Sequence, residues 1–243
     1  MSPEETSKLE KLQKIIGIEF RRIELLKQAL IHRSYVNEIP DKNQLQHNER
    51  IEFLGDAVLE LIITEYLFST YPKHKEGELT SFRAATVRTS SLAETAETIN
   101  LGEYIYLSNG EERTGGRKRP YILANTFESL LGAIYLDQGL EKVKDFLDKT
   151  LIPKIANIIA HRLDIDSKSK LQEMAQEILG ITPSYYLLSA VGPDHAKEFQ
   201  MSVKIGEKEC GEGKGRNKQE AEENAAKDAL KNWKNIVPGK LAS

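Results

Sequence analysis

The sequence predicts an all-α domain followed by a small α+β domain, in which the elements run α-β-β-β-α around an antiparallel three-stranded sheet. Two observations lead to this prediction. Up to about Ala160 the apolar residues recur at helical spacing, and no strand-like alternation of useful length is present. After residues 161–166 one more helical segment is followed by short stretches of strand-like alternation. A chain of 243 residues is long enough for two such domains, each with its own core.

The first domain, residues 1–160, is expected to be helical throughout. Glycine and proline residues interrupt its apolar periodicity and separate the helices, for example at Gly17, Pro72 and Gly139. Helices are predicted at residues 8–16, 21–32, 48–71, 78–87, 89–99, 120–137 and 140–160.

The second domain is predicted at residues 168–236, after a linker at 161–167 and before a tail at 237–243. Its elements are predicted as a helix at Lys168–Leu179, strands at Ser184–Ala190, at Phe199–Ile205 and from Lys208 onward, and a last helix through about Trp233. Asn217 and Glu220 occupy the two positions of a capping box at the start of that last helix. We expect both helices on one face of the sheet.

The composition is that of an ordinary soluble protein, with 29% charged and 40% hydrophobic residues. No apolar run approaches the roughly 20 residues that cross a bilayer, and the first residues do not resemble a signal peptide. The single cysteine, Cys210, excludes intramolecular disulfides and cysteine-rich zinc sites. We therefore expect a cytoplasmic protein that has no membrane partner and no small-molecule organic cofactor. The net charge of −3 means that any contact with nucleic acid depends on local geometry.

Acidic residues of the predicted helix 48–71 are the first candidate functional feature. If this segment is helical, Glu49, Glu52, Asp56 and Glu60 fall within a stripe about 80° wide, and apolar residues border that stripe on both sides. Burial and mutual repulsion would protonate such carboxylates unless cations neutralised them. The stripe is therefore either a site for hard metal ions or a solvated acidic edge on a core helix, and this segment alone leaves both interpretations open.

The predicted helix 120–137 contains a second acidic position. Between residues 121 and 136 most residues are apolar and the only acid is Glu128. Asn125 lies one turn before Glu128 on the same side of the helix. A lone glutamate in such a helix needs either a protein partner or a metal ion.

Three polar features of the second domain suggest a ligand for it. Residues 211–218 lead into the last helix and include Lys214, Arg216 and Lys218, which suits either a phosphate site or a hairpin loop with solvated lysines. The loop 191–197 projects His195 and Lys197. The outer face of helix Lys168–Leu179 carries Lys168, Gln172 and Gln176. Three polar segments of this kind suit duplex RNA, because its minor grooves offer 2′-hydroxyls and the phosphates between those grooves attract cations.

Taken together, these segments resemble bacterial ribonuclease III over nearly the whole chain. His47–Leu59 resembles the signature helix of that family. Other matching segments of the first domain are Ala29–Tyr35, Lys75–Thr80 and Leu123–Asp137. The C-terminal part resembles a double-stranded-RNA-binding domain through Leu171–Glu173, Gly192–His195 and Lys218–Ala226.

The resemblance implies an obligate homodimer of all-helical endonuclease domains that holds duplex RNA in a valley. It implies Mg²⁺ as cofactor, with Mn²⁺ able to substitute, and products that carry 5′-phosphate and 3′-hydroxyl ends with short 3′ overhangs. The implied substrates are ribosomal-RNA precursors and other structured transcripts. By position the family's catalytic and metal-binding residues map to Asp56, Glu128, Glu52 and Asn125, its auxiliary acids to Glu49 and Glu76, and an aromatic residue of its dimer interface to Phe53. From the residues alone, Phe53 is as easily a core phenylalanine.

The chain departs from the family pattern at two positions. Asn125 stands where the family usually has aspartate, so the site loses one negative charge although an amide oxygen can still ligate Mg²⁺. Lys218-Gln219 stands where the family often has two basic residues, and Arg216 or Lys214 can supply the second contact. Asn125 leaves an alternative open, in which the protein binds double-stranded RNA at a disabled metal site and does not cleave it. A purely structural helical dimer would leave the acidic stripe unexplained.

Overall fold

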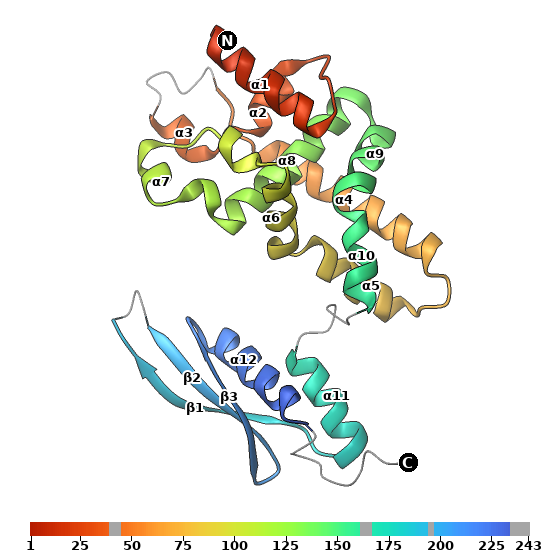
Figure 1. Cartoon of the computed structure of the whole chain (residues 1–243), viewed down its shortest axis with the longest axis vertical. Helices are drawn as coiled ribbons and strands as arrows, with labels where there is room; N and C mark the ends of the chain where they lie inside the picture. The colour runs from red at the N-terminus through yellow and green to blue at the C-terminus, as the bar shows by residue number, and fades with distance from the viewer. Residues whose placement is uncertain (39–44, 161–166, 194–196, 234–243) are drawn as a thin grey trace. The chain divides into compact units, whose positions relative to one another are not determined.

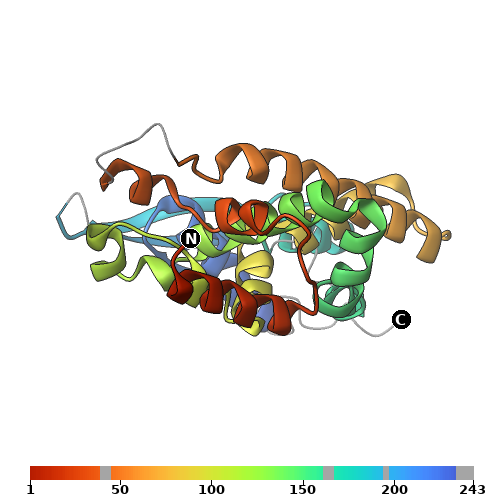
Figure 2. The same ribbon diagram turned by 90° about the horizontal axis from the view of Figure 1, so that it is seen from above.

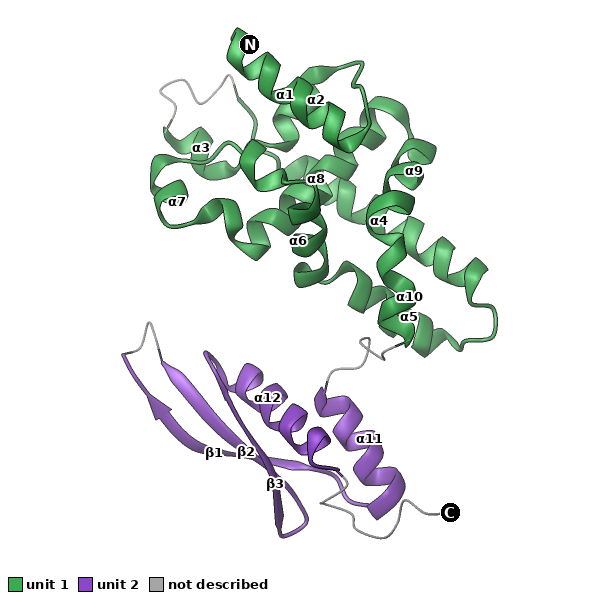
Figure 3. Cartoon of the chain, viewed as in Figure 1, with its two compact units in different colours: residues 1–164 green, residues 165–243 purple. Residues whose placement is uncertain are grey.

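The structure is a computed structural model that describes residues 1–38, 45–160, 167–193 and 197–233 (Figure 1). The chain divides into two compact units, residues 1–164 and 165–243 (Figure 3). Most of the expected linker and the whole expected tail lie outside the described residues. Among the helices that the structure describes, none has both the length and the apolar character needed to span a bilayer.

Unit 1 is all-helical, as the sequence predicts. Its α-helices are α1 (Pro3–Ile16), α2 (Ile23–Ala29), α3 (Arg33–Glu38), α4 (Glu49–Thr70), α5 (Glu76–Val87), α6 (Thr89–Thr98), α7 (Asn109–Arg113), α8 (Pro120–Gln138), α9 (Leu140–Thr150) and α10 (Ile152–Ala160). Two 3₁₀ turns, η1 (Leu101–Tyr104) and η2 (Gly116–Lys118), lie between α6 and α8. Seen from above, α4 and α1 lie on opposite sides of the unit (Figure 2).

Several boundaries differ from the expectation for local reasons. Helix α1 begins earlier, at Pro3, because Ser2 and Glu5 form a reciprocal capping box. The expected helix 140–160 is two helices, and Pro153 lies in the first turn of the second, where its missing N–H costs no hydrogen bond. The expected helix 21–32 ends at Ala29, because the chain then pairs with a distant segment through a bridge between Ile31 and Tyr106.

Helices α4 and α8 pack together most extensively, and glycine makes their close approach feasible. A Cβ atom at Gly55 of α4 would lie 1.8 Å from the carbonyl oxygen of Glu128 in α8. A Cβ atom at Gly132 of α8 would lie 2.3 Å from the carbonyl oxygen of Ile51 in α4. The two backbones are therefore in direct contact, and this contact brings Glu128 to the acidic side of α4.

Unit 2 has the predicted α-β-β-β-α order. It consists of α11 (Ser167–Leu179), β1 (Ser184–Val191), β2 (Glu198–Ile205), β3 (Lys208–Gly215) and α12 (Lys218–Lys231). The sheet is antiparallel with strand order β1-β2-β3, and both helices lie on one side of it (Figure 1). Leu171 and Ala175 of α11 share one buried core with Val203 of β2 and Ala225 of α12.

Glycines 211, 213 and 215 belong to strand β3, so residues 211–215 continue the strand that was predicted from Lys208 onward, and the alternative of a hairpin loop here was wrong. A Cβ atom at Gly213 would lie 2.1 Å from the backbone nitrogen of Ala225. Gly211 and Gly215 face Ala229 and Ala221 of α12 in the same way. A strand turns every second residue to one face, so this alternation lets α12 lie directly on the sheet. The glycines serve packing, and the two residues between them, Glu212 and Lys214, point to the other face.

The expected capping box of α12 is present only in part. The Asn217 side chain accepts a hydrogen bond from the Glu220 backbone N–H at 2.9 Å, as predicted. The Glu220 carboxylate accepts from the N–H of Arg216 at 2.8 Å, one residue before the expected donor. The helix start is still capped from both sides.

Candidate active site

The acidic residues of α4 meet Glu128 where α4 crosses α8. Glu52 and Asp56 lie one turn apart on α4, on either side of Gly55. Glu128 lies one turn before Gly132 on α8. Because the helix backbones touch at the two glycines, the three carboxylates share one side of the crossing.

The electrostatics of this site disfavour negative charge. Burial, and then the charges of Asp56, Glu52 and Glu60, raise the pKa of Glu128 to about 7. Burial also raises the pKa of Glu52, and the charges of Glu49 and Asp56 raise it further. A bound divalent cation would reverse this penalty and favour the ionised carboxylates.

The donor set of this site suits a hard cation. Carboxylate oxygens from Glu52, Asp56 and Glu128 and the amide oxygen of Asn125 are ligands that Mg²⁺ accepts. Asn125 is half-buried one turn before Glu128 on α8. Within the described residues, no three His, Cys, Asp or Glu side chains already form a preformed metal-binding group.

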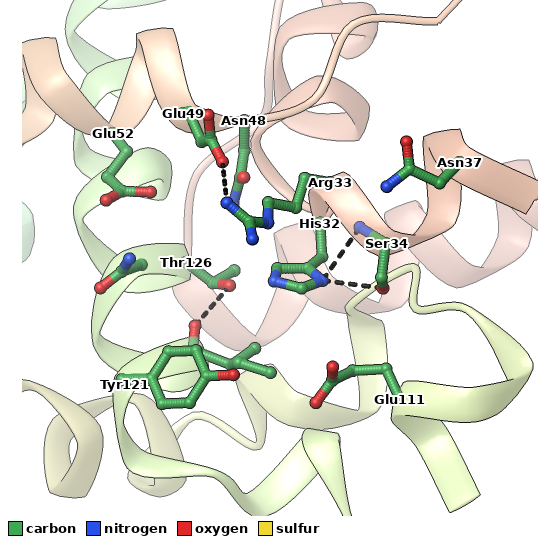
Figure 4. Close-up of a pocket in the computed structure, with 12 residues that line it drawn as sticks. His32, Arg33, Ser34, Asn37, Asn48, Glu49, Glu52, Glu111, Tyr121 and Thr126 are labelled. Carbon is green, nitrogen blue, oxygen red and sulfur yellow. Dashed lines mark hydrogen bonds and ion pairs between the residues drawn. The ribbon is translucent and has the colours of Figure 1, made fainter. Parts of the chain in front are cut away.

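A pocket of about 500 Å³ adjoins these residues (Figure 4). Glu49, Glu52 and Asn125 are among the residues that line it. The lining also includes His32, Arg33, Asn37 and Tyr121, together with Glu111 of α7. Asp56 and Glu128 are not among the lining residues, so the pocket extends away from the α4–α8 crossing.

The two expected auxiliary acids have different surroundings. The Glu49 carboxylate lies 3.7 Å from Arg33 Nη1 and 3.7 Å from His47 Nδ1, and it lines the pocket beside Glu52. Glu76 is exposed at the start of α5, where its carboxylate accepts a hydrogen bond from the Thr80 hydroxyl at 3.0 Å. The structure thus brings Glu49 next to Glu52 but does not place Glu76 in the pocket.

Phe53 is not part of the core of this chain. It is 80% exposed on α4, and the same helix exposes Leu61 (56%) and Phe68 (75%). Residues 53, 61 and 68 are separated by eight and seven positions, so they lie on one helical face. Helix α4 therefore has an uncovered apolar face beside its acidic one.

The expected RNA contacts of unit 2 are only partly accessible. Gln172 on α11, Lys214 on β3, and Arg216 and Lys218 near the start of α12 are exposed. Lys214 Nζ lies 3.8 Å from the carboxylate of Glu198. Lys197 is half-buried, and His195 lies outside the described residues.

Lys168 on the expected RNA-contacting face of α11 is not a free cation. It pairs with Glu222 at 2.6 Å, and its ammonium group lies 5.0 Å from the centre of the Tyr185 ring. Gln176 on the same face donates a hydrogen bond to the Thr182 hydroxyl at 2.8 Å. Of the three side chains on this face, Gln172 remains the clearest candidate for an RNA contact.

Sequence reasoning missed the residues that position the site. Gly55 and Gly132 had a detectable signal, because a glycine inside a strongly apolar helix indicates close packing. His32 had only the resemblance to single it out, although its ring forms part of the pocket wall. Its Nδ1 lies 2.8 Å from the Ser34 hydroxyl, which also accepts the backbone N–H of Ser108 at 3.1 Å. Burial lowers the pKa of His32, so the ring is neutral at neutral pH.

Comparisons with known proteins agree with this architecture. The family model described as ribonuclease-III-like matches residues 22–155, and the double-stranded RNA binding motif matches residues 167–232. Ribonuclease 3 of Listeria monocytogenes is 46% identical over 91% of this chain and 96% of its own length. Ribonuclease 3 of Nitratiruptor is 45% identical over 92% and 96%.

Solved structures show the same relationship for unit 1. The nuclease domain of ribonuclease III from Campylobacter jejuni is 41% identical with a TM-score of 0.56. It covers 62% of this chain and 99% of its own length. With both sequence motifs and the nuclease fold in place, the chain belongs to the ribonuclease III family, as a ribonuclease that carries a nuclease domain and a double-stranded-RNA-binding motif.

Proposed function

We propose that this chain is an endoribonuclease that hydrolyses double-stranded RNA with Mg²⁺, for which Mn²⁺ can substitute. The products carry 5′-phosphate and 3′-hydroxyl ends with short 3′ overhangs. One observation supports this proposal above all others: Glu128 is a half-buried carboxyl with a pKa of about 7, raised by its burial and by the acids of α4. Strongly perturbed carboxyl groups of this kind cluster at functional sites.

The role that we propose for each residue follows from the oxygen atoms that its side chain can offer to a metal ion or to water. Glu52 and Glu128 hold the metal through carboxylate oxygens, and Asn125 holds it through its amide oxygen. Asp56, which is exposed on α4, accepts a hydrogen bond from the attacking water and orients it in line with the phosphate. Bound Mg²⁺ supplies Lewis-acid stabilisation of the phosphate and of the leaving 3′-oxygen. Glu49 and Glu76 act as auxiliary acids farther from the reacting atoms.

Unit 2 supplies the affinity for duplex RNA. Gln172 contacts 2′-hydroxyls or base edges in a minor groove, and Lys214, Arg216 and Lys218 contact phosphates. His195 and Lys197 contact a second minor groove. The physiological substrates are ribosomal-RNA precursors and other structured transcripts in the cytoplasm.

The active protein is a homodimer, and the exposed apolar face of α4 supports this part of the proposal. Phe53, Leu61 and Phe68 would leave a large apolar surface in water if the chain remained a monomer. The Campylobacter jejuni structure is described as having structural flexibility in a region involved in dimer formation of its nuclease domain. A second copy of this chain, packed through α4, accounts for the exposed residues.

A non-cleaving binder of double-stranded RNA is the second candidate, and Asn125 is the observation that favours it. An amide in place of a carboxylate removes one charge from the metal site. The three carboxylates of the crossing are nevertheless retained, which favours the nuclease.

A cleavage assay distinguishes the two candidates. The substrate is an end-labelled RNA duplex of about 35 base pairs, roughly twice the ~16 base pairs that one RNA-binding domain spans. We expect cleavage in Mg²⁺ and binding without cleavage in Ca²⁺, because Ca²⁺ takes looser coordination and activates water poorly. Glu128→Gln should abolish cleavage while it preserves RNA binding. Intact duplex after incubation of the wild type with Mg²⁺ would favour the binder.

A further inference from the structure

The pocket beside the metal site is lined in part by residues that the proposed hydrolysis does not use. They include His32, Arg33 and Asn37, from α3 and the residue before it, and Tyr121, from the first turn of α8 (Figure 4). The volume of the pocket, about 500 Å³, is within the range of small-ligand pockets, roughly 300–1,000 Å³. The pocket is continuous with Glu52 and Asn125, so its occupant would lie next to the scissile phosphate.

The lining offers a phosphate group no unpaired positive charge. Three carboxylates, those of Glu49, Glu52 and Glu111, line the pocket with one cationic residue, Arg33, and Glu111 is paired with Arg119. Arg33 is already shared with Glu49 at 3.7 Å. Burial keeps His32 neutral, so it adds no positive charge. An anion would therefore find no free cation here, whereas a neutral group rich in N–H donors would find carboxylate oxygens as acceptors.

Tyr121 provides a flat, preorganised surface at the mouth of this pocket. The residue is 48% exposed, and its hydroxyl accepts a hydrogen bond from Arg119 Nη1 at 3.2 Å. The Arg119 guanidinium lies 5.7 Å from the ring centre. Arg119 is itself fixed by Glu111 and by the carbonyl oxygen and hydroxyl of Thr114. An exposed aromatic ring held in this way is suited to stacking on a nucleobase.

We infer that this pocket is a subsite for one unpaired nucleobase of the RNA strand next to the cleavage point. The inference rests on the proposed function, because a staggered cut in a duplex leaves unpaired nucleotides beside the cut phosphate. The base stacks on Tyr121 and directs its N–H donors toward the carboxylates of Glu49 and Glu111. Guanine, which has adjacent imino and amino donors, fits this lining better than uracil, which has one imino donor between two carbonyls.

The test compares product-like duplexes of equal paired length whose ends are blunt or carry two-nucleotide 3′ overhangs of guanosine or of uridine. Binding is measured by fluorescence anisotropy in Ca²⁺, so that no chemistry intervenes. We expect the wild type to bind the guanosine overhang most tightly and the blunt duplex least tightly. Tyr121→Ala should weaken overhang binding roughly tenfold, through the loss of stacking, and leave blunt-end binding unchanged.

Tyr135→Ala is the matched control. Tyr135 is on the same helix, is 36% exposed and does not line the pocket, so this variant should behave as wild type. Equal binding of all three duplexes by the wild type would overturn the inference. So would a Tyr121→Ala variant that sediments as a monomer, because the pocket would then serve the contact between subunits.

The same proteins in the Mg²⁺ cleavage assay separate this inference from the proposed function. Wild-type protein that cleaves a long duplex but shows no overhang preference refutes the subsite alone. Wild-type protein that neither cleaves nor prefers overhangs refutes both.

Discussion

Glu128 shows at the scale of a single residue how the fold prepares a site for a cation. Its carboxyl lies in an otherwise apolar helix, and the acids of α4 face it across the helix crossing. Burial and those charges together raise its pKa to about 7. The metal-free protein therefore contains a carboxyl group that is destabilised whenever it is ionised.

This destabilisation predicts a pH-dependent stability difference for Glu128→Gln. The folded-state pKa of about 7 lies above the ordinary value of 4.5. The free energy of unfolding of the wild-type protein therefore falls as the pH rises from about 4.5 to about 7. A neutral glutamine removes this dependence. In EDTA the melting temperature of the variant should exceed that of the wild type by more at about pH 8 than at about pH 5. A relief of about 1 kcal/mol corresponds to roughly 2–4 °C in a domain of this size.

Thermal unfolding of both proteins at the two pH values decides the matter. If the melting temperatures of the variant and the wild type differ by the same amount at pH 5 and at pH 8, Glu128 does not titrate within this interval.

A second prediction at the residue scale concerns the effect of Asn125 on Mg²⁺ binding. A neutral amide is a weaker ligand than a carboxylate, so Asn125→Asp should tighten Mg²⁺ binding. The gross attraction is largely offset by desolvation and by repulsion from Glu52 and Glu128, so a net gain of about 1 kcal/mol, or several-fold, is expected. Titration of Mg²⁺ against the initial cleavage rate should show a lower half-saturation and a similar rate at saturation. Superimposable curves would exclude Asn125 as a metal ligand.

At the scale of secondary-structure elements, glycine-mediated contact places the functional groups in both units. In unit 1 the crossing of α4 and α8 at Gly55 and Gly132 brings the three carboxylates to one side. In unit 2 the alternating glycines of β3 let α12 lie on the sheet, with Lys214 on the opposite face of the strand. In each case the small residue has a structural role and its polar neighbours are left for function.

The helix crossing predicts a severe effect of Gly55→Ala. The added methyl group would lie 1.8 Å from the Glu128 carbonyl oxygen, so the helices must separate. We expect a destabilisation of about 1–3 kcal/mol, as for overpacked cores, and a loss of cleavage that exceeds the loss of RNA binding. Urea unfolding and the cleavage assay measure the two effects.

Gly77→Ala is the control for this prediction. A Cβ atom at Gly77 in α5 meets nothing within 4 Å, so alanine there should leave stability unchanged or raise it through helix propensity. Equal stabilities of the Gly55→Ala and Gly77→Ala variants would show that the α4–α8 contact is looser than the structure indicates.

At the scale of the whole molecule, the two units divide the work of cleavage and binding. Each has its own buried core, and the two cores share no residue. The Campylobacter jejuni structure covers only the part equivalent to unit 1, so a nuclease domain of this family can be studied alone.

Deletion of residues 168–243 should therefore leave a folded, dimeric nuclease with poor affinity for RNA. The helical core and the candidate metal site remain intact, whereas the main phosphate contacts are lost. The deficit in cleavage relative to the full chain should be largest at high salt, where the remaining contacts are screened. Sedimentation and cleavage at two salt concentrations test this, and an aggregated or monomeric fragment would contradict it.

The sequence by itself determined the all-α and α-β-β-β-α parts, the acidic stripe of α4, and the isolated Glu128. These depend on local periodicity, because the side chains of a helix or strand repeat at a spacing that is readable without any long-range contact. Boundaries differed from the prediction where a distant segment pairs with the chain, as at Ile31, whose bridge to Tyr106 ends the helical run.

Only the tertiary structure decided how these features combine. The pKa of Glu128, the pocket beside Glu52, the exposure of Phe53 and the packing role of the β3 glycines all depend on residues far apart in the sequence. Gly55 and Gly132 are separated by more than a quarter of the chain, so no local pattern predicts that they are in contact. Burial and electrostatic coupling are properties of the packed chain, because they depend on which surfaces exclude water together.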